Sequence, residues 1–197
     1  PGDRSVKLDL HTHINGNGSE NRWANIVRLS TLLQGAGADG LMLGCHDWVA
    51  PPDLIRRCED TFGLIVIPGS EITTDAGHVL ALGINEITPP IHGNSRAPVE
   101  VHAAIAEIHR LGGKAVMSHP FGGPGSHWPW PDRLAEIADE LDGAEIRNLK
   151  AFVRHGVAEF TWFERPSGWL LTSGSDCHPW EGDSVSADYL TMVELPL

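Results

Sequence analysis

The stretch that decides the fold is Val6-Lys-Leu-Asp9-Leu-His11-Thr-His13, in which an apolar run leads directly into two histidines spaced two residues apart. The run at residues 6–10 has the length and composition of a buried β-strand. In extended backbone, residues i and i+2 share a face, so His11 and His13 can point into one cavity. Taken alone, the pair is as compatible with coincidence as with a pair of ligands.

The rest of the chain alternates short apolar runs with amphipathic segments of helical length. This alternation predicts repeated β-α units that build a parallel sheet or barrel. No linker rich in Gly, Ser or Pro divides the 197 residues, so we expect one domain over residues 1–197. The expected strands are residues 6–10, 41–44, 64–68, 78–82, 115–118, 144–146, 169–173 and 189–194. The expected helices lie near residues 22–34, 52–60, 98–111, 131–141 and 149–164.

Further histidines and carboxylates stand at or just beyond the ends of the expected strands, each in a short polar phrase. In a parallel α/β barrel these positions converge over one mouth. Imidazole nitrogens and carboxylate oxygens gathered there form a site for Zn²⁺, Mn²⁺ or Fe²⁺, and burying them without a ligand is costly. A lone histidine is more often structural, so the prediction depends on the whole set. The set comprises His11, His13, His46, Glu71, His78, His119, Glu145, Asp176 and His178.

Composition and charge narrow the expected partners and location. The net charge of −12 with neutral histidines argues against an extended nucleic-acid surface, which needs a basic face. A small anionic substrate stays compatible, because bound cations would reverse the local potential. The apolar runs are too short for a membrane span, and no signal peptide is visible. Three cysteines without a CxxC pair favour a reducing compartment, so we expect a cytoplasmic protein, with a removed leader left open.

Two further motifs allow more than one interpretation. Gly35-Ala-Gly-Ala-Asp-Gly40 has the glycine spacing of a dinucleotide-binding loop. It ends an expected helix and precedes a strand, so we interpret it as a helix end and a turn. The loop at residues 121–131 carries Trp128 and Trp130, which either stack on a substrate ring or cover the rim of the barrel.

The opening Asp9-Leu-His-Thr-His13 and the closing Gly174-Ser-Asp-Cys-His178 resemble the first and last signatures of the PHP (polymerase and histidinol phosphatase) family of metal-dependent phosphoesterases. Two other phrases, at residues 77–83 and 171–176, are similar to a branch that includes carbaryl-hydrolase-like (CehA/McbA) metallohydrolases. The resemblance implies an α/β fold, a distorted (β/α)7 TIM-like barrel with one strand fewer than the common eight.

The resemblance also implies two or three divalent ions, which would be Zn, Mn or Fe. A third ion needs an acidic or histidine ligand shortly after the opening motif, where this sequence has a Gly/Asn stretch. Glu20 fills that role only through a two-residue insertion, and Asn17 is a poorer donor. The implied ligands are His11, His13, Asp176 and bridging Glu71 for the first ion, Glu71, His78 and His119 for the second, and His46 and His178 for the third.

The function expected from these features is hydrolysis of a small phosphate mono- or diester by a hydroxide that bridges two metals. Asp176 and His178 are expected to position the water or to assist the leaving group. Arg147 either binds a phosphate oxygen in a bidentate fork or forms a surface salt bridge.

Several alternatives to these assignments stay open. The same centre would suit hydrolysis of a carboxylic ester, amide or carbamate, and a metal-binding regulatory domain without turnover is a third interpretation. Asp9 and Asp47 either orient ligand imidazoles or cap strand ends. The sequence leaves the oligomeric state open.

Overall fold

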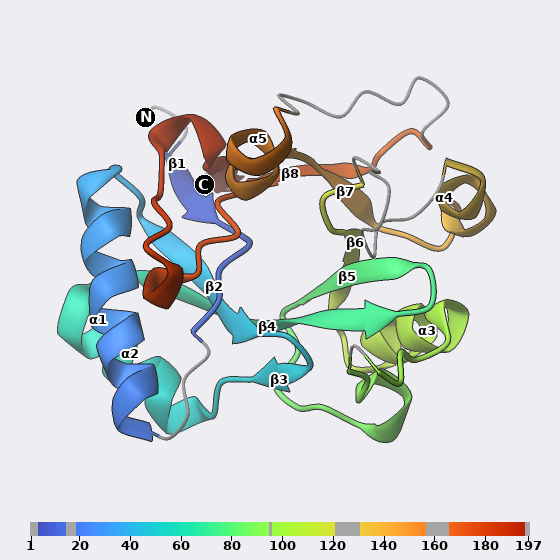
Figure 1. Cartoon of the computed structure of the whole chain (residues 1–197), viewed down its shortest axis with the longest axis horizontal. Coiled ribbons are helices and arrows are strands. Elements are labelled where there is room, and N and C mark those ends of the chain that lie inside the picture. Colours follow the sequence, from blue (N-terminus) through green and yellow to red (C-terminus); the bar gives the residue numbers. More distant parts are fainter. Residues whose placement is uncertain (1–3, 15–18, 95, 121–130, 157–165, 196–197) are drawn as a thin grey trace.

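The computed structural model describes residues 4–14, 19–94, 96–120, 131–156 and 166–195. Its strands form one mixed sheet in the order β8-β7-β6-β5-β4-β2-β1-β9, with β3 paired to β2 (Figure 1). The strands are β1 (Arg4–Asp9), β2 (Gly40–Cys45), β3 (Trp48–Val49), β4 (Ile65–Thr74), β5 (Gly77–Leu82), β6 (Lys114–Met117), β7 (Gly143–Asn148), β8 (Leu170–Gly174) and β9 (Thr191–Leu195). The helices are α1 (Ser19–Gly35), α2 (Pro52–Phe62), α3 (Val101–Arg110), α4 (Pro131–Ile137) and α5 (Leu149–His155), with 3₁₀ turns η1 (Pro89–Ile91), η2 (Pro179–Glu181) and η3 (Ala187–Tyr189).

The sheet curls until its two edge strands meet. At the seam, the Thr191 hydroxyl of β9 accepts a hydrogen bond from the Ser173 N–H of β8 at 2.8 Å and donates to the Ser173 carbonyl at 2.9 Å. The seam has these side-chain bonds in place of a regular backbone ladder. The sheet is therefore a nearly closed barrel, which confirms the expected α/β barrel class.

Antiparallel pairing distorts the barrel in the middle of the sheet. The pairs β1–β2, β2–β4, β6–β7 and β7–β8 are parallel, whereas β5 is antiparallel to both β4 and β6. Strand β5 follows β4 through a hairpin that reaches Gly77 at φ 107°, a backbone conformation that favours glycine. This hairpin replaces the β-α unit that alternation alone predicts at this point. The count of seven β-α units stays a prediction.

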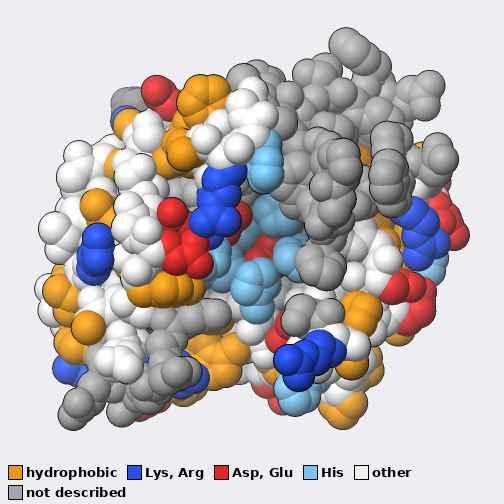
Figure 2. Space-filling view, viewed as in Figure 1, with side chains coloured by type: hydrophobic (Ala, Val, Ile, Leu, Met, Phe, Trp, Pro, Cys, Tyr) orange, Lys and Arg blue, Asp and Glu red, His pale blue; other side chains and the backbone are white. Residues whose placement is uncertain are grey.

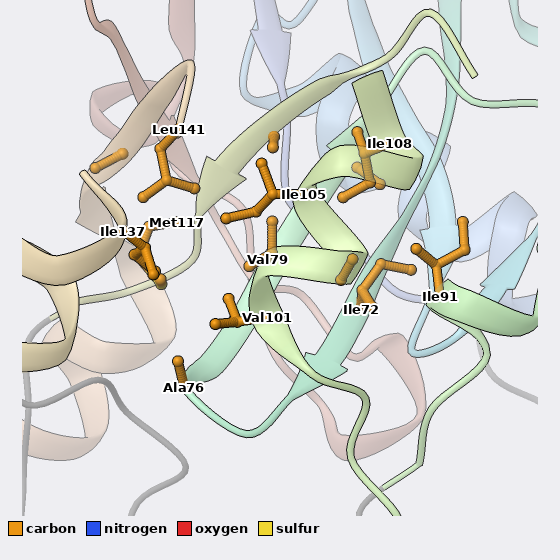
Figure 3. Packing of buried hydrophobic residues seen from close by; sticks show 14 of the residues in the cluster. Ile72, Ala76, Val79, Ile91, Val101, Ile105, Ile108, Met117, Ile137 and Leu141 are labelled. Carbon is orange, nitrogen blue, oxygen red and sulfur yellow. The ribbon is translucent and has the colours of Figure 1, made fainter. Parts of the chain in front are cut away.

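Two clusters of buried apolar side chains pack the helices onto the outside of the sheet. Helices α3 and α4 lie against β4, β5 and β6 through Ile72, Val79, Ile105, Ile108 and Ile137 (Figure 3). Helices α1 and α2 cover β2 and β4 on the other side of the barrel (Figure 1). A third cluster fills the interior of the barrel, and its buried members are Val6, Leu8, Leu10, Met42, Leu80, Leu82 and Val116. The packed interior leaves the strand ends as the place for a site.

Helix ends differ from expectation where capping decides them. Helix α3 begins at Val101 instead of residue 98, because the Glu100 side chain accepts hydrogen bonds from the N–H groups of His102 and Ala103. Helix α5 ends at His155, where Gly156 adopts the left-handed conformation at φ 70°, and the expected extension to residue 164 falls outside the described residues. Helix α1 ends at Gly35 and β2 begins at Gly40, which confirms the helix-end interpretation of that glycine motif.

No helix within the described part of the chain combines the length and hydrophobicity needed to cross a bilayer.

Candidate metal centre

The first and last motifs of the sequence lie side by side at the ends of β1 and β8. Thr12 and Cys177 form an isolated parallel bridge, and the His13 N–H donates to the Cys177 carbonyl at 3.1 Å. The Asp176 N–H donates to the His11 carbonyl at 2.8 Å. These backbone bonds hold His11, His13 and Asp176 together although the two motifs are far apart in the sequence.

Glu71 forms the centre of the site. It lies within the long strand β4, past the end expected from the sequence, and its side chain is 1% exposed. Its Oε1 atom faces three imidazole nitrogens: His11 Nε2 at 3.3 Å, His78 Nδ1 at 3.1 Å and His119 Nε2 at 3.0 Å. Its Oε2 atom faces two others: His46 Nδ1 at 3.0 Å and His13 Nε2 at 3.3 Å. The two oxygens of one buried carboxylate thus face two sets of histidines.

Asp176 closes the site on the side of the first motif. Its Oδ1 atom lies 3.1 Å from His13 Nε2 and 3.6 Å from His11 Nε2, and those two nitrogens are 3.2 Å apart. Asp176 adopts φ 51°, as Asp47 does at φ 49° and His119 at φ 25°. Left-handed backbone costs a residue with a Cβ about 1–2 kcal/mol. Three such residues stand at strand ends, which indicates that the fold tolerates backbone strain where these side chains are directed into the site.

The side chains fit divalent cations. Four groups of three ligand atoms lie within 4.8 Å of one another and draw on all the expected ligands except Glu20, whose side chain is outside the description. The two ring nitrogens that approach each other at 3.2 Å need a shared positive ion or a proton between them. The groups are His11–His13–Asp176, His11–Glu71–His119, His46–Glu71–His78 and His13–His46–His178.

The charges within the cluster shift its titration strongly. Burial opposes ionisation of Glu71, but the neighbouring histidines outweigh it and hold the pKa of this carboxyl well below its ordinary value. The pKa of Asp176 is lowered in the same way against the burial penalty, by His11 and His13. Burial alone would lower the pKa of His13, yet the hydrogen bonds that its ring donates to its neighbours, Asp176 first, raise it to about 10. The raised pKa of His13 and the lowered pKa of Glu71 and Asp176 thus both favour positive charge beside these carboxylates.

Two histidines at the edge of the cluster behave in the opposite way. Burial lowers the pKa of His46 to about 4, and burial together with the charge of His13 lowers the pKa of His178 to about 4. Both rings are therefore neutral near pH 7, and each keeps one nitrogen lone pair.

Glu145 orients the ligands from behind. It is fully buried, and both of its oxygens lie 3.2 Å from His11 Nδ1. Its Oε2 atom also accepts from the His119 backbone N–H at 2.8 Å and from Asn148 Nδ2 at 3.0 Å. A carboxylate can only accept, so it holds the ring hydrogen of His11 on Nδ1 and leaves Nε2 for a metal.

The two aspartates left open by the sequence serve the backbone. Asp9 Oδ1 accepts from the N–H groups of His11 at 3.2 Å and Ser175 at 3.0 Å, which joins the first motif to the last. Asp47 accepts from the Thr73 N–H at 2.9 Å and the Thr73 hydroxyl at 2.7 Å, so it ties its turn to β4. Of the two interpretations left open for Asp9 and Asp47, capping of strand ends fits these contacts.

The structure does not bring Arg147 to the cluster. A β-bulge between Glu145 and Arg147 breaks the period-two alternation along β7, and the guanidinium lies 4.9 Å from the centre of the Tyr189 ring. Lys150, which the sequence argument missed, reaches the cluster from α5 and contacts His178 Nδ1. The only local signal for it is its place two residues after Asn148, at the end of β7. Trp128 and Trp130 lie outside the described residues.

The space-filling view shows how the site opens to solvent. Histidine side chains gather in a hollow in the middle of the face, with carboxylate oxygens beneath them and charged side chains of both signs at one edge (Figure 2). The fold and this site together define a nearly closed α/β barrel with a candidate centre for divalent cations at its mouth.

The comparisons with known proteins agree with that description. No protein-family model matches the chain. Over 160 residues the chain is 28% identical to the uncharacterized protein MJ1587 of Methanocaldococcus jannaschii. The aligned region covers 77% of this chain and 86% of that protein.

Two solved structures share the fold. One is a two-domain protein from Bacteroides vulgatus that contains a predicted PHP-like metal-dependent phosphoesterase, with a TM-score of 0.59 and 20% identity over 92% of this chain. This chain spans 55% of that protein. The other, from Bifidobacterium adolescentis, is assigned by prediction as a metal-dependent phosphoesterase, with a TM-score of 0.58 and 18% identity over 86% of each chain. At these identities the likeness establishes the fold, and the case for chemistry comes from the side chains.

Proposed function

We propose that this chain is a metal-dependent phosphoesterase that hydrolyses a small phosphate mono- or diester. The observation that carries the proposal is the placement of Glu71, whose two buried oxygens face two separate sets of imidazoles. A carboxylate in this position suits a bridge between two neighbouring cations. The predicted activities of the two structural neighbours support the same choice.

The PHP resemblance groups His11 with His13 and Asp176, whereas His11 Nε2 faces the same oxygen of Glu71 as His78 and His119 and so lies between the two proposed ions. Glu71 takes part in both sets, and each set draws on strand ends from different parts of the chain. We therefore also propose that residues 1–197 act as one domain. The proposed ligands are His11, His13, Asp176 and Glu71 for one ion and Glu71, His78 and His119 for the other.

Two divalent cations bound there would supply an ionised water near neutral pH and would offset the charge that develops on the phosphate. Glu71 and Asp176, both with lowered pKa, stay ionised and fix the position of the cations. Glu145 keeps Nε2 of His11 available, as its hydrogen bonds to the ring require. Neutral His178, whose Nδ1 lies 3.5 Å from Asp176 Oδ1, would hold or deliver a proton for the leaving group.

The charge of the chain supports a small anionic substrate. The hollow is lined by histidines, and the chain carries a net charge of −12, so its surface would repel a long polyanion while the cations would attract a small one. Arg147, whose guanidinium lies over the ring of Tyr189, takes no part in the proposed substrate site.

Hydrolysis of three nitrophenyl compounds tests this proposal. We expect protein loaded with Mn²⁺ or Zn²⁺ to hydrolyse p-nitrophenyl phosphate or bis(p-nitrophenyl) phosphate, and to leave p-nitrophenyl acetate largely intact. The double variant His11→Ala/His13→Ala should lose both metal and activity. The matched control is His109→Ala, because His109 pairs with Asp142 on the surface. Faster turnover of the acetate would favour carboxylic ester, amide or carbamate hydrolysis, and full metal content with no turnover would favour a regulatory domain.

A further inference from the structure

Lys150 places its ammonium group among three acceptors beside the centre. Its Nζ contacts His178 Nδ1 and lies 3.1 Å from Asp183 Oδ2 and 3.2 Å from Glu181 Oε2. The side chain is 10% exposed. An ammonium has three hydrogens and no lone pair, so these three acceptors match its full donor capacity.

The same three partners have the geometry of a cation site. His178, Glu181 and Asp183 offer ligand atoms that lie within 4.8 Å of one another. Glu181 is also held by Arg154, whose Nη2 donates to Oε2 at 2.7 Å, and the His178 N–H donates to Asp183 Oδ2 at 3.1 Å. These bonds keep the acceptors in place around a positive charge.

We propose that the Lys150 ammonium takes the place of a third metal ion at this centre, so that the chain holds two divalent ions and excludes a third. A metal ion cannot use these acceptors while the ammonium occupies them, because the same lone pairs would serve both and the two cations would repel. One of the three acceptors, His178, is also an expected ligand of the third ion, so the ammonium competes with that ion directly. The inference rests on the metal centre of the proposed function and is independent of its substrate.

The contact with Lys150 also sets the role of His178. Because an ammonium only donates, the proposal requires His178 Nδ1 to accept, and a ring with one hydrogen then carries it on Nε2. That nitrogen has no lone pair for a metal. Nδ1 also lies 2.8 Å from the Asp176 carbonyl: a ring that donated there would oppose two donors at Lys150, and a ring that accepts from Lys150 opposes two acceptors at the carbonyl. His178 is therefore a hydrogen donor beside the ligand set, where its ring stacks on that of His13 with centroids 4.2 Å apart.

Metal stoichiometry tests the proposal directly. Protein stripped with chelator is reloaded with Zn²⁺, separated from free metal, and analysed for its ratio of zinc to protein. We expect two ions per chain in the wild type and three in Lys150→Ala, because that variant frees the acceptors. The matched control Lys114→Ala should stay at two, since Lys114 pairs with Asp142 on the surface. Circular dichroism verifies that each variant is folded.

A second measurement reports on His178 whether or not the variant gains an ion. Nitrogen NMR of the zinc-loaded wild type should show His178 with its hydrogen on Nε2. Three ions in the wild type, no gain in Lys150→Ala, or a hydrogen on Nδ1 would each overturn the role of Lys150 and leave the proposed hydrolysis intact. A wild type that binds no zinc would overturn the metal centre itself.

Discussion

Substitution of Glu145 by glutamine tests how the barrel prepares His11 for a metal. Glutamine has nearly the same shape, but one of its two terminal groups is a donor. If its oxygen keeps the bonds to the His119 N–H and to Asn148, its amide NH₂ faces His11 Nδ1. The ring must then accept at Nδ1 and carry its hydrogen on Nε2, the nitrogen that lies 3.3 Å from Glu71 Oε1. His11 is thereby lost as a ligand although its ring stays in place.

The expected cost is a fall in metal affinity of about 10- to 100-fold, which is typical for loss of a group that orients a ligand. This corresponds to about 1.4–2.7 kcal/mol of binding free energy. Competition between the zinc-loaded protein and a chromophoric chelator measures it. The control Glu140→Gln makes the same chemical change at a surface carboxylate, whose Oε1 lies 2.7 Å from His102 Nδ1, and should have no effect. Wild-type affinity in Glu145→Gln would refute the argument that this carboxylate selects the ring nitrogen.

Three further changes probe the centre. Glu71→Gln should reduce bound zinc to below about one ion per chain by elemental analysis, because the shared charge is lost; retention of two ions would contradict the bridge. Asp9 has its pKa raised to about 6 by burial, against an ordinary 3.8, so folded protein keeps its proton between about pH 4 and 6 while unfolded protein loses it. The contribution of Asp9 to the stability of the metal-free protein should therefore fall by up to about 3 kcal/mol as the pH rises through this window, and urea titrations should show it as a pH-dependent difference in unfolding free energy between the wild type and Asp9→Asn. Gly174→Ala would place a Cβ 2.4 Å from His11 Cβ and should cost about 1–3 kcal/mol in urea unfolding, whereas Gly35→Ala, with no atom within 4 Å, should cost nothing.

The gathering of these histidines and carboxylates could be predicted from the sequence because period-two spacing and strand-end positions are local properties. His11 and His13 share a cavity, as their spacing indicates, and Asp176 lies beside them. The fold class also follows from alternation of strands and helices. The antiparallel hairpin of β4 and β5 does not, because which strand pairs with which depends on the packing of the whole sheet.

Two features near the end of β7 could not be read from the sequence, and both have physical causes. For Arg147 the sequence left a phosphate contact and a surface salt bridge open, and the bulge in β7 changes the alternation of side chains between Glu145 and Arg147. Lys150 was overlooked because its role arises only when η2 and the turn at Asp183 fold back over α5. Contacts of this kind join segments about 30 residues apart and leave no periodic trace in the sequence.

The contact between the first and last motifs links metal binding to the stability of the fold. Asp9 and Ser175, which are 166 residues apart, are bonded directly beneath the proposed ligands, close to the strands that form the seam of the barrel. An ion bound by His11 and Asp176 would hold the two edges of the barrel together, and its binding free energy would add to the stability of the folded state. Without bound metal, we expect local unfolding to begin at this seam. The rate of proteolysis would then depend on how much metal is available.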